Sequence, residues 1–357
     1  MHISRGLLFR SFVLISMSLL LISCNTQRQK REFQLYLCES DGESFAQLSR
    51  IHYSLIDLGS LGSSLNNYPF RVHHTHAEDL LLMQSDGLFR FEAQSRKFHA
   101  IGTGEDFSYM DNSYLQTTEQ EGKQYFFNNH KLHLIQDDEP LLVQGDIRAC
   151  VGLPYSSRLS VLMNDGLSLN DQASPGNWNP TITLPREASR AYHFADWGGI
   201  VYLSNNRFYR CAGDGSDEEL LFGLNSSVMG YATFFPIDDA GRFITTNRID
   251  DLNCLFLIDA QSGDIQNLGS ISYSQTKDHF YRPFQLSMNS ARSKVLYFDS
   301  TALYSLDLQS LETQTLLMSN TSNLHMRNIT GASQSADGRH YAFLADLYKY
   351  KKVRQAR

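Results

Sequence analysis

Three histidines stand within one short segment, Arg71-Val72-His73-His74-Thr75-His76. Successive side chains of a β-strand point to opposite faces, so His74 and His76 would share one face. Imidazole nitrogens bind divalent metals such as zinc, and two of them on one face could form part of a metal site. No acidic or cysteine partner for them can be identified from the sequence. His74 and His76 are therefore weak candidates for metal ligands, and with His73 they are candidates for a polar ligand-binding surface.

Two other segments carry aromatic and basic side chains among polar residues. Residues 172 to 180 contain Trp178, and residues 270 to 283 contain Tyr273, His279, Tyr281 and Arg282. Aromatic residues and arginine on loops are typical of recognition surfaces. We predict that these five residues bind a ligand; the alternative is that the aromatic rings pack between structural units.

Motifs that would name a reaction are missing from the sequence. There is no G-x-S-x-G elbow, P-loop or Rossmann fingerprint, so serine-hydrolase, nucleotide and dinucleotide chemistry lack their usual signatures. The segment Asp214-Gly215-Ser216-Asp217-Glu218-Glu219 has the acidity of a calcium loop but not the bidentate glutamate that closes one. We predict a hairpin turn there, and no cofactor.

The chain begins with a short apolar segment. Residues 11 to 23 carry no charge and follow Arg5 and Arg10. A helix of that length would extend roughly 20 Å, whereas the hydrocarbon core of a membrane is about 30 Å thick. A basic start followed by a short apolar core is typical of a secretory signal.

The end of this segment and the cysteine that follows it, Leu21-Ile22-Ser23-Cys24, resemble the lipobox of bacterial lipoproteins. The resemblance implies that residues 1 to 23 are a signal peptide, that cleavage occurs before Cys24, and that Cys24 carries the acyl chains that anchor the protein. The alternative is an ordinary signal peptide with a chance cysteine. Asn25 is not the aspartate that marks inner-membrane retention in enteric bacteria, so this reading places the protein in the bacterial cell envelope, at the outer membrane.

Charge argues against a nucleic-acid partner. The formal net charge is −7, and the one basic cluster lies in the tail, residues 349 to 357. Because phosphate binding depends on clustered lysine and arginine, we predict no nucleic acid and a solvated tail.

The remaining four cysteines, Cys38, Cys150, Cys211 and Cys254, are scattered without metal-binding spacing. An oxidising envelope would permit disulfides, but single cysteines within apolar segments are more often buried free thiols. Free thiols are the favoured interpretation.

From Phe33 onward, short apolar runs alternate with turn residues, and no useful window has a helical apolar stripe. The runs form hairpins that begin near residues 80, 124, 160, 200, 243, 295 and 341, with turns such as N-N-H and S-N-N. The spacing is that of four-stranded propeller blades. We predict an all-β fold, a single β-propeller over residues 33 to 348, with seven blades and with six or eight as alternatives. The histidine segment would then be an innermost strand, lining the central channel.

The last repeat is incomplete, since the chain ends soon after its first hairpin strand. Residues 33 to 58 supply two further strand patterns. We therefore predict that the amino-terminal strands complete the last blade, with residues 24 to 32 as a tether from the anchor. Such closure leaves no sheet edge exposed.

The segment Q-S-A-D-G-R-H-Y-A-F, residues 334 to 343, resembles the S-P-D-G-K signature of TolB-type propeller repeats, and two earlier segments resemble it more weakly. The resemblance implies a scaffold and carries no catalytic residues. The segment Ile258-Asp259-Ala260-Gln261-Ser262-Gly263 resembles part of a repeat of BamB, a lipidated envelope propeller, but the tryptophan of that repeat is absent.

These features favour a lipid-anchored, non-catalytic binding or scaffold protein whose partner is a protein or a glycan; an envelope assembly factor is a third possibility, besides the enzyme considered next. The alternative is an envelope enzyme, a glycan lyase or hydrolase with its site at the channel mouth. Ionisable residues with perturbed pKa values gathered in one pocket would favour the enzyme. A mouth with aromatic and amide groups would favour binding.

Overall fold

The computed structural model describes the chain over residues 30–39, 45–54, 71–75, 79–84, 87–92, 95, 97–104, 106–107, 114–118, 123–156, 158–170, 182–225, 233–250, 252–271, 285–299, 302–318 and 328–349. Within these ranges every named element is a β-strand, which confirms the all-β prediction. None of these residues belongs to a helix long and apolar enough to cross a membrane.

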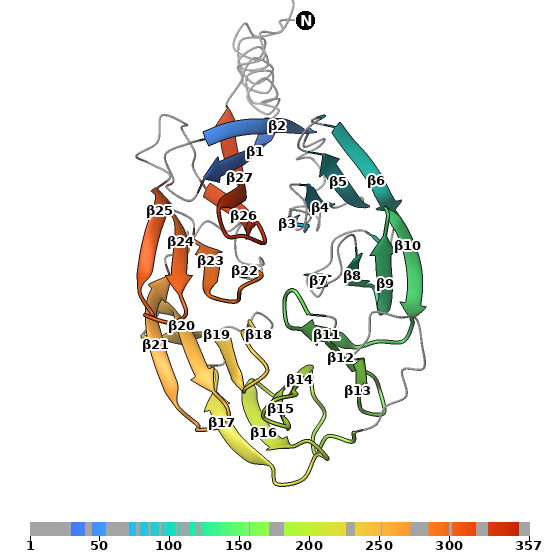
Figure 1. Cartoon of the computed structure of the whole chain (residues 1–357), viewed down its shortest axis with the longest axis vertical. Helices are drawn as coiled ribbons and strands as arrows, with labels where there is room; N and C mark the ends of the chain where they lie inside the picture. The colour runs from blue at the N-terminus through green and yellow to red at the C-terminus, as the bar shows by residue number, and fades with distance from the viewer. Residues whose placement is uncertain are drawn as a thin grey trace, which may run out of the picture.

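The described strands form seven antiparallel sheets, six with four strands and one with three. They stand around a common centre as the sheets of a β-propeller do (Figure 1). The first three sheets from the innermost strand outward are β3 (Arg71–His74), β4 (Leu80–Gln84), β5 (Gly87–Glu92) and β6 (Lys97–Thr103); β7 (Tyr114–Thr117), β8 (Lys123–Asn128), β9 (Lys131–Gln136) and β10 (Glu139–Gln144); and β11 (Ala149–Gly152), β12 (Leu159–Leu162) and β13 (Leu167–Asn170).

The next three sheets repeat this order with four strands each. They are β14 (Arg190–Phe194), β15 (Gly199–Ser204), β16 (Arg207–Ala212) and β17 (Glu219–Gly223); β18 (Phe235–Pro236), β19 (Arg242–Ile249), β20 (Leu252–Asp259) and β21 (Ile265–Ile271); and β22 (Ser287–Met288), β23 (Lys294–Phe298), β24 (Ala302–Asp307) and β25 (Thr313–Met318). In the three-stranded sheet an isolated bridge pairs Leu167 of β13 with Ile182, on the side where a fourth strand would lie.

The seventh sheet combines the two ends of the described chain. Its order is β26 (Asn328–Gln334), β27 (His340–Lys349), β1 (Lys30–Glu39) and β2 (Phe45–Ser54). β1 and β27 are antiparallel over ten residue pairs, from Lys30↔Lys349 to Glu39↔His340. The ladder therefore starts three residues before Phe33, where the sequence places the domain boundary. Residues 1 to 29 and 350 to 357, with the signal peptide, Cys24 and most of the predicted tether and tail, lie outside the described residues.

The hairpin positions expected from the sequence agree with the second strand of every sheet. Each predicted start lies within one residue of the first residue of β4, β8, β12, β15, β19, β23 or β27. The predicted turns have the backbone that such hairpins require: Asn129 and His130 have φ of 46° and 61°, and Asn205 and Asn206 have φ of 48° and 60°. Positive φ at both central residues matches the right-handed twist of the flanking strands.

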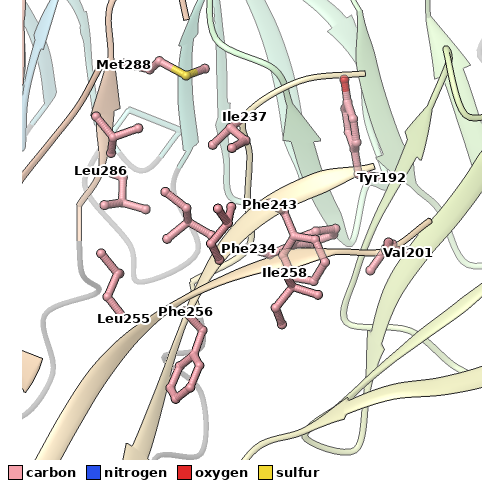
Figure 2. Close-up of a cluster of buried hydrophobic side chains, with 14 of the residues drawn as sticks. Tyr192, Val201, Phe234, Ile237, Phe243, Leu255, Phe256, Ile258, Leu286 and Met288 are labelled. Carbon is pink, nitrogen blue, oxygen red and sulfur yellow. The ribbon is translucent and has the colours of Figure 1, made fainter. Parts of the chain in front are cut away.

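The second strands are buried on both faces because sheets pack against them from each side. All six residues of β15 are buried, as are five of the six in β8. The largest apolar cluster lies between the β14–β17, β18–β21 and β22–β25 sheets, where Phe234, Phe243 and Ile258 pack together (Figure 2). Aromatic contacts extend this cluster, with the Phe234 and Phe243 rings 5.0 Å apart at 79°, a favourable edge-on arrangement.

Polar side chains on the innermost strands join neighbouring sheets. The Gln334 amide nitrogen of β26 donates to the Ser287 carbonyl at 2.7 Å and to the Lys294 carbonyl at 2.9 Å. The His193 amide of β14 donates to the Ser160 hydroxyl of β12 at 3.1 Å. Because these groups are buried, each bond satisfies a polar atom that water cannot reach. The bonds fix the innermost strands, which position the site described next.

Candidate functional site

A cavity of about 170 Å³ lies at the centre of the ring. It is lined from the innermost strands β3, β7, β11 and β14 and from the residues at and before β18 and β22 (Figure 1). Six of the seven sheets therefore contribute to it. Concave sites of this kind, at the axis of a closed arrangement of sheets, are the usual place for a ligand.

One end of the cavity is marked by the first residues of the innermost strands. Arg71 begins β3, Tyr114 begins β7, Arg190 begins β14, and Arg148 immediately precedes β11. All four line the cavity. Since each of the six sheets that line the cavity is entered through its innermost strand, these strands run in one direction and their first residues share one end of the channel. We call this the open end only to distinguish it from the opposite end, which a described loop crosses; residues 55–70, 108–113, 226–232 and 272–284, which lead towards these strands, lie outside the described ranges.

The other end is crossed by the loop between β11 and β12, whose described residues are 153 to 156 and 158; we call it the plug loop. Its Tyr155 is buried and has a positive φ of 54°. The amide of Tyr155 donates to the Thr117 carbonyl of β7 at 3.0 Å. The guanidinium of Arg292, from the turn between β22 and β23, donates to the Tyr155 carbonyl at 3.2 Å. The plug loop is thus held from two other sheets.

Gln116 of β7 is the main support of the plug loop. Its amide nitrogen donates to the carbonyl of Leu153 at 2.9 Å and to that of Ser156 at 3.0 Å, and Gln116 is 1 % exposed. The residue before the loop is Gly152, where a Cβ would collide with the Gln116 side chain. A glycine is therefore required for the close approach of β7 and β11.

Asp239 contacts side chains from several turns near the end that the plug loop crosses. Asp239 accepts a hydrogen bond from the Tyr192 hydroxyl at 3.2 Å. Its other carboxylate oxygen lies 3.5 Å from an Arg158 nitrogen and 3.9 Å from an Arg292 nitrogen. Asp239 comes from the β18–β19 turn and Arg158 from the plug loop, so these contacts tie three turns together.

The two described histidines of the predicted cluster have different positions. His73 lines the cavity, and its Nε2 lies 2.7 Å from the Thr117 hydroxyl. That hydroxyl donates to the His74 carbonyl, so it accepts from His73 and places the proton of His73 on Nε2. His74 is buried where β3 meets β26, and its amide donates to the Ser333 hydroxyl at 2.9 Å.

Burial keeps both imidazoles neutral. Desolvation, with a smaller contribution from Arg71, lowers the pKa of His73 to about 4. Desolvation, with His73 and His340 nearby, lowers the pKa of His74 to about 3. Of these two described histidines, His73 lines the cavity as predicted for a polar channel lining, whereas His74 is buried between sheets and does not line it. Over the described residues no three His, Cys, Asp or Glu side chains are grouped to hold a metal.

Other ionisable groups of the cavity are also kept neutral. Burial raises the pKa of the Tyr114 phenol and of the Cys150 thiol well above their usual values. The Tyr114 hydroxyl lies 2.9 Å from the Gly152 carbonyl and accepts the Gly152 amide proton. Cys150 is free and buried, as are Cys211 and Cys254. No aspartate or glutamate lies among the described lining residues. A tyrosine, a thiol and an imidazole that stay neutral near pH 7 are weak proton donors or acceptors at that pH.

The remaining predicted site residues lie outside the described ranges. They are His76, Trp178, Tyr273, His279, Tyr281 and Arg282. The acidic segment of residues 214 to 219 forms the predicted turn after β16. The Asp214 carboxylate accepts a hydrogen bond from the Ser216 amide at 2.9 Å, as expected for an Asx turn.

Sequence reasoning missed the arginines of the open end. Arg71, Tyr114 and Arg190 each stand nine residues before the first residue of the next strand, β4, β8 or β15. This constant offset within the repeats was the signal that could have identified them. Arg148 stands eleven residues before β12, because the β11–β12 connection is longer.

No protein-family model matches the chain, and no curated protein matches it. Solved structures do match. PorZ, a bacterial surface component of the type-IX secretion system of Porphyromonas gingivalis, aligns over 79 % of this chain with 11 % identity and a TM-score of 0.51. The alignment spans 37 % of the PorZ chain, so this chain corresponds to little more than a third of that protein.

An oligogalacturonate lyase from Vibrio parahaemolyticus aligns over 90 % of this chain and 100 % of its own, with 11 % identity and a TM-score of 0.50. A putative TolB from Agrobacterium tumefaciens aligns over 89 % of this chain, with 9 % identity and a TM-score of 0.48. This TM-score is too low to support an argument from the structure, so the resemblance to TolB-type proteins rests on the repeat pattern of the sequence. At such low identities, the first two alignments establish the fold, and they confirm that the chain is a β-propeller.

Proposed function

We propose that this protein is a non-catalytic binding protein of the bacterial cell envelope, which takes its ligand at the open end of the central cavity. One observation carries the proposal: the described lining contains three arginines and no carboxylate, and its histidine, tyrosine and cysteine are held in their neutral forms. Such a lining provides contact and charge but lacks a group poised to exchange a proton at neutral pH.

A cavity-filling substitution tests this proposal. Ser189 lies at the open end, lines the cavity and is exposed. Ser189→Trp should block the cavity, and Ser189→Ala should leave it open. We expect peptides or glycans selected from arrays on the wild-type protein to bind Ser189→Ala and to lose at least tenfold in affinity for Ser189→Trp. Ligands that bind both variants equally would place the binding surface elsewhere.

The alternative function is that of an envelope lyase or hydrolase acting on glycans. It is supported by the fold that the chain shares with the Vibrio oligogalacturonate lyase. Incubation with oligogalacturonate and with neutral oligosaccharides, followed by mass spectrometry of the products, distinguishes the two functions. Turnover that is lost in Ser189→Trp would establish the enzyme and contradict the binding proposal.

The proposed location rests on the Leu21-Ile22-Ser23-Cys24 segment. Cleavage before Cys24 and acylation of that residue would anchor the protein stably, since more than one acyl chain is needed for firm attachment, and the outer membrane is the proposed destination. Mass spectrometry of the membrane-extracted protein should find lipid on Cys24, and Cys24→Ala should release the protein from the membrane. A Cys24 without lipid on the mature protein would exclude the anchor.

We further propose that the ring has seven blades and closes through its two ends. The three-stranded β11–β13 sheet would be the blade that lacks a regular fourth strand. The antiparallel ladder between β1 and β27 supports the closure. In this arrangement the anchored end of the chain enters the ring directly at β1, which would hold the propeller close to the membrane.

A further inference from the structure

Basic residues from opposite ends of the sequence meet in the seventh sheet. β1 and β27 lie side by side there (Figure 1), and the outermost pairs of their ladder are Lys30↔Lys349 and Arg31↔Tyr348. On its other side β1 is paired with β2, which faces Lys30 and Arg31 with Ser54 and Tyr53. The ladder thus gathers basic residues at one of its ends, and the residues that face them are basic or neutral.

This end of the ladder lies on the same side of the ring as the open end. The amide of His74, the last residue of β3, donates to the Ser333 hydroxyl near the end of the neighbouring β26, so β26 runs in the same direction as β3. Asn328, the first residue of β26, faces Asp346 of β27, and β27 continues from there to Lys349. A surface bound at Lys349 would therefore lie opposite the plug loop.

Both segments of chain that meet at this end are basic. Residues 28 to 32 and 346 to 357 contain two acidic residues, Glu32 and Asp346, and eight basic ones. The basic residues are Arg28, Lys30, Arg31, Lys349, Lys351, Lys352, Arg354 and Arg357. We call these eight the basic ladder end. Its charge is opposite in sign to that of the whole chain, which is −7.

Chain connectivity keeps the basic ladder end near the proposed anchor. Lys30 is six residues after Cys24, and six residues of extended chain span at most about 22 Å. By the same limit, Lys351 and Lys352 remain within roughly 11 Å of Lys349. Acyl chains on Cys24 would therefore bring both basic segments within reach of the lipid headgroups, whose potential acts over a Debye length of about 8 Å at physiological ionic strength.

We propose that the basic ladder end binds the phosphate groups of anionic phospholipids and holds the propeller against the membrane beside the acyl anchor. This inference rests on the proposed envelope location and adds a second membrane contact to it. Acyl chains and clustered basic residues are complementary means of membrane attachment. Because the remaining chain is acidic, an anionic surface repels it and favours contact through the basic ladder end.

The basic ladder end alone should bind reversibly, because salt screens its attraction to lipid. Release of Cys24→Ala from the membrane therefore remains the expected result for the anchor. The lipid contact has to be measured on protein without acyl chains, where the anchor does not mask it.

The test is sedimentation of the mature chain, residues 24 to 357, with lipid vesicles. The chain is produced without acylation and contains every strand of the described structure. The vesicles consist of phosphatidylcholine alone or of phosphatidylcholine with phosphatidylglycerol, at low and at physiological ionic strength. Circular dichroism and thermal unfolding verify that each form of the protein is folded.

Two variants each remove two charges from one segment of the basic ladder end. They are Arg28→Gln/Lys30→Gln and Lys351→Gln/Lys352→Gln. We expect the wild type to bind the phosphatidylglycerol vesicles, more weakly as the ionic strength rises, and not to bind phosphatidylcholine. Each basic residue near an anionic surface raises the affinity roughly fivefold, so each variant should lose at least tenfold.

A matched control removes the same charge from the other side of the ring. Lys97 is the first residue of β6 and Lys123 the first of β8, and both strands start at the end that the plug loop crosses. Lys97→Gln/Lys123→Gln should leave vesicle binding unchanged. Ser189→Trp, which blocks the cavity, should also leave it unchanged, because the basic ladder end is not part of the cavity lining.

Equal binding to both kinds of vesicle, or binding to neither, would overturn the lipid contact and leave the proposed cavity function standing. An equal loss in Lys97→Gln/Lys123→Gln would show that total charge, and not the basic ladder end, decides binding. A loss in Ser189→Trp would assign the lipid to the cavity instead. Tighter binding to a duplex oligonucleotide than to the vesicles would identify nucleic acid as the partner and overturn the lipid. Vesicle binding by a protein whose Cys24 carries no lipid in cells would exclude the anchor and leave this surface standing.

Discussion

Arg292 and Tyr155 are 137 residues apart in the chain, yet the Arg292 guanidinium donates a hydrogen bond to the Tyr155 carbonyl at 3.2 Å. They belong to the β22–β25 and β11–β13 sheets, which lie on opposite sides of the ring (Figure 1). The contact therefore crosses the channel at one end. Hydrogen bonds from a charged donor to a buried acceptor are among the stronger ones in proteins.

Arg292→Gln should loosen the plug loop. We expect a loss of about 1–3 kcal/mol in the free energy of unfolding, because the Tyr155 carbonyl loses a charged donor. Amide hydrogen exchange should accelerate in residues 153 to 158. Arg242→Gln is the control, since Arg242 pairs with Asp238 four residues away at a partly exposed site and such pairs contribute less than about 1 kcal/mol. Equal exchange rates in both variants would show that Arg292 does not hold the loop.

Two buried glutamines of neighbouring strands should respond in opposite ways to the same substitution. Gln116→Met should destabilise the protein by about 2 kcal/mol or more, because the Leu153 and Ser156 carbonyls lose their donor. Gln124→Met should be neutral or stabilising, because neither polar atom of the buried Gln124 amide has a hydrogen-bond partner in the described structure. Urea unfolding midpoints measure the difference, and equal losses would contradict the role of Gln116.

Stability should depend on pH through the buried histidines. The pKa values of His73 and His74, about 4 and about 3, lie below the value of about 6.5 expected for an unfolded chain. Between these values the unfolded chain binds protons that the folded chain does not. The stabilisation is therefore complete above pH 6.5 and is lost as the pH falls towards 4, by up to about 1.4 kcal/mol per pH unit for each histidine.

Urea unfolding at pH 7, 6, 5 and 4.5 measures this slope. The slope should decrease in His73→Gln, whose amide can replace the Nε2 donor to Thr117, and in His74→Asn. A wild-type protein equally stable at pH 7 and pH 4.5 would contradict the neutral, buried state of both rings.

The proposed closure of the ring can be tested by a cross-link between its two ends. Gln34 of β1 faces Ala345 of β27 in the ladder, and Glu32 faces Leu347. Facing residues of an antiparallel pair have Cα atoms about 4.5–5.5 Å apart, which is compatible with a disulfide. Gln34→Cys/Ala345→Cys should cross-link on mild oxidation, and Glu32→Cys/Ala345→Cys, displaced by two residues, should do so poorly. Intact-mass measurement after thiol blocking reports the bond, and equal yields would argue against this register.

The sequence predicted the strands well because their pattern is local. Turns such as Asn205-Asn206 need positive φ, and the apolar runs between them are long enough only for strands, so hairpin positions follow from neighbouring residues. The start of the seventh sheet was harder: β1 begins at Lys30 because its ladder with β27 continues to Lys349, and a polar strand end gives no apolar signal.

The lining of the cavity could not be predicted from the sequence because it depends on how distant residues converge. Arg71, Arg148 and Arg190 line one cavity only because of the ring geometry, and the constant offset of Arg71 and Arg190 from the next strand becomes a signal only once the repeats are aligned. The histidine cluster was selected because three histidines lie close together in the sequence. Side chains alternate between the two faces of β3, so His74 is buried between sheets while His73 lines the cavity. The plug loop could not be predicted from the sequence for the same reason, because Gln116 and Arg292, which hold it, are distant from it in the chain.

The plug loop reaches across the channel through the contacts of Tyr155 with Thr117 and Arg292. If the proposed binding function holds, a ligand that enters from the opposite end would meet this loop, so a long polymer could not be threaded past it and would have to offer an end or a protruding side group.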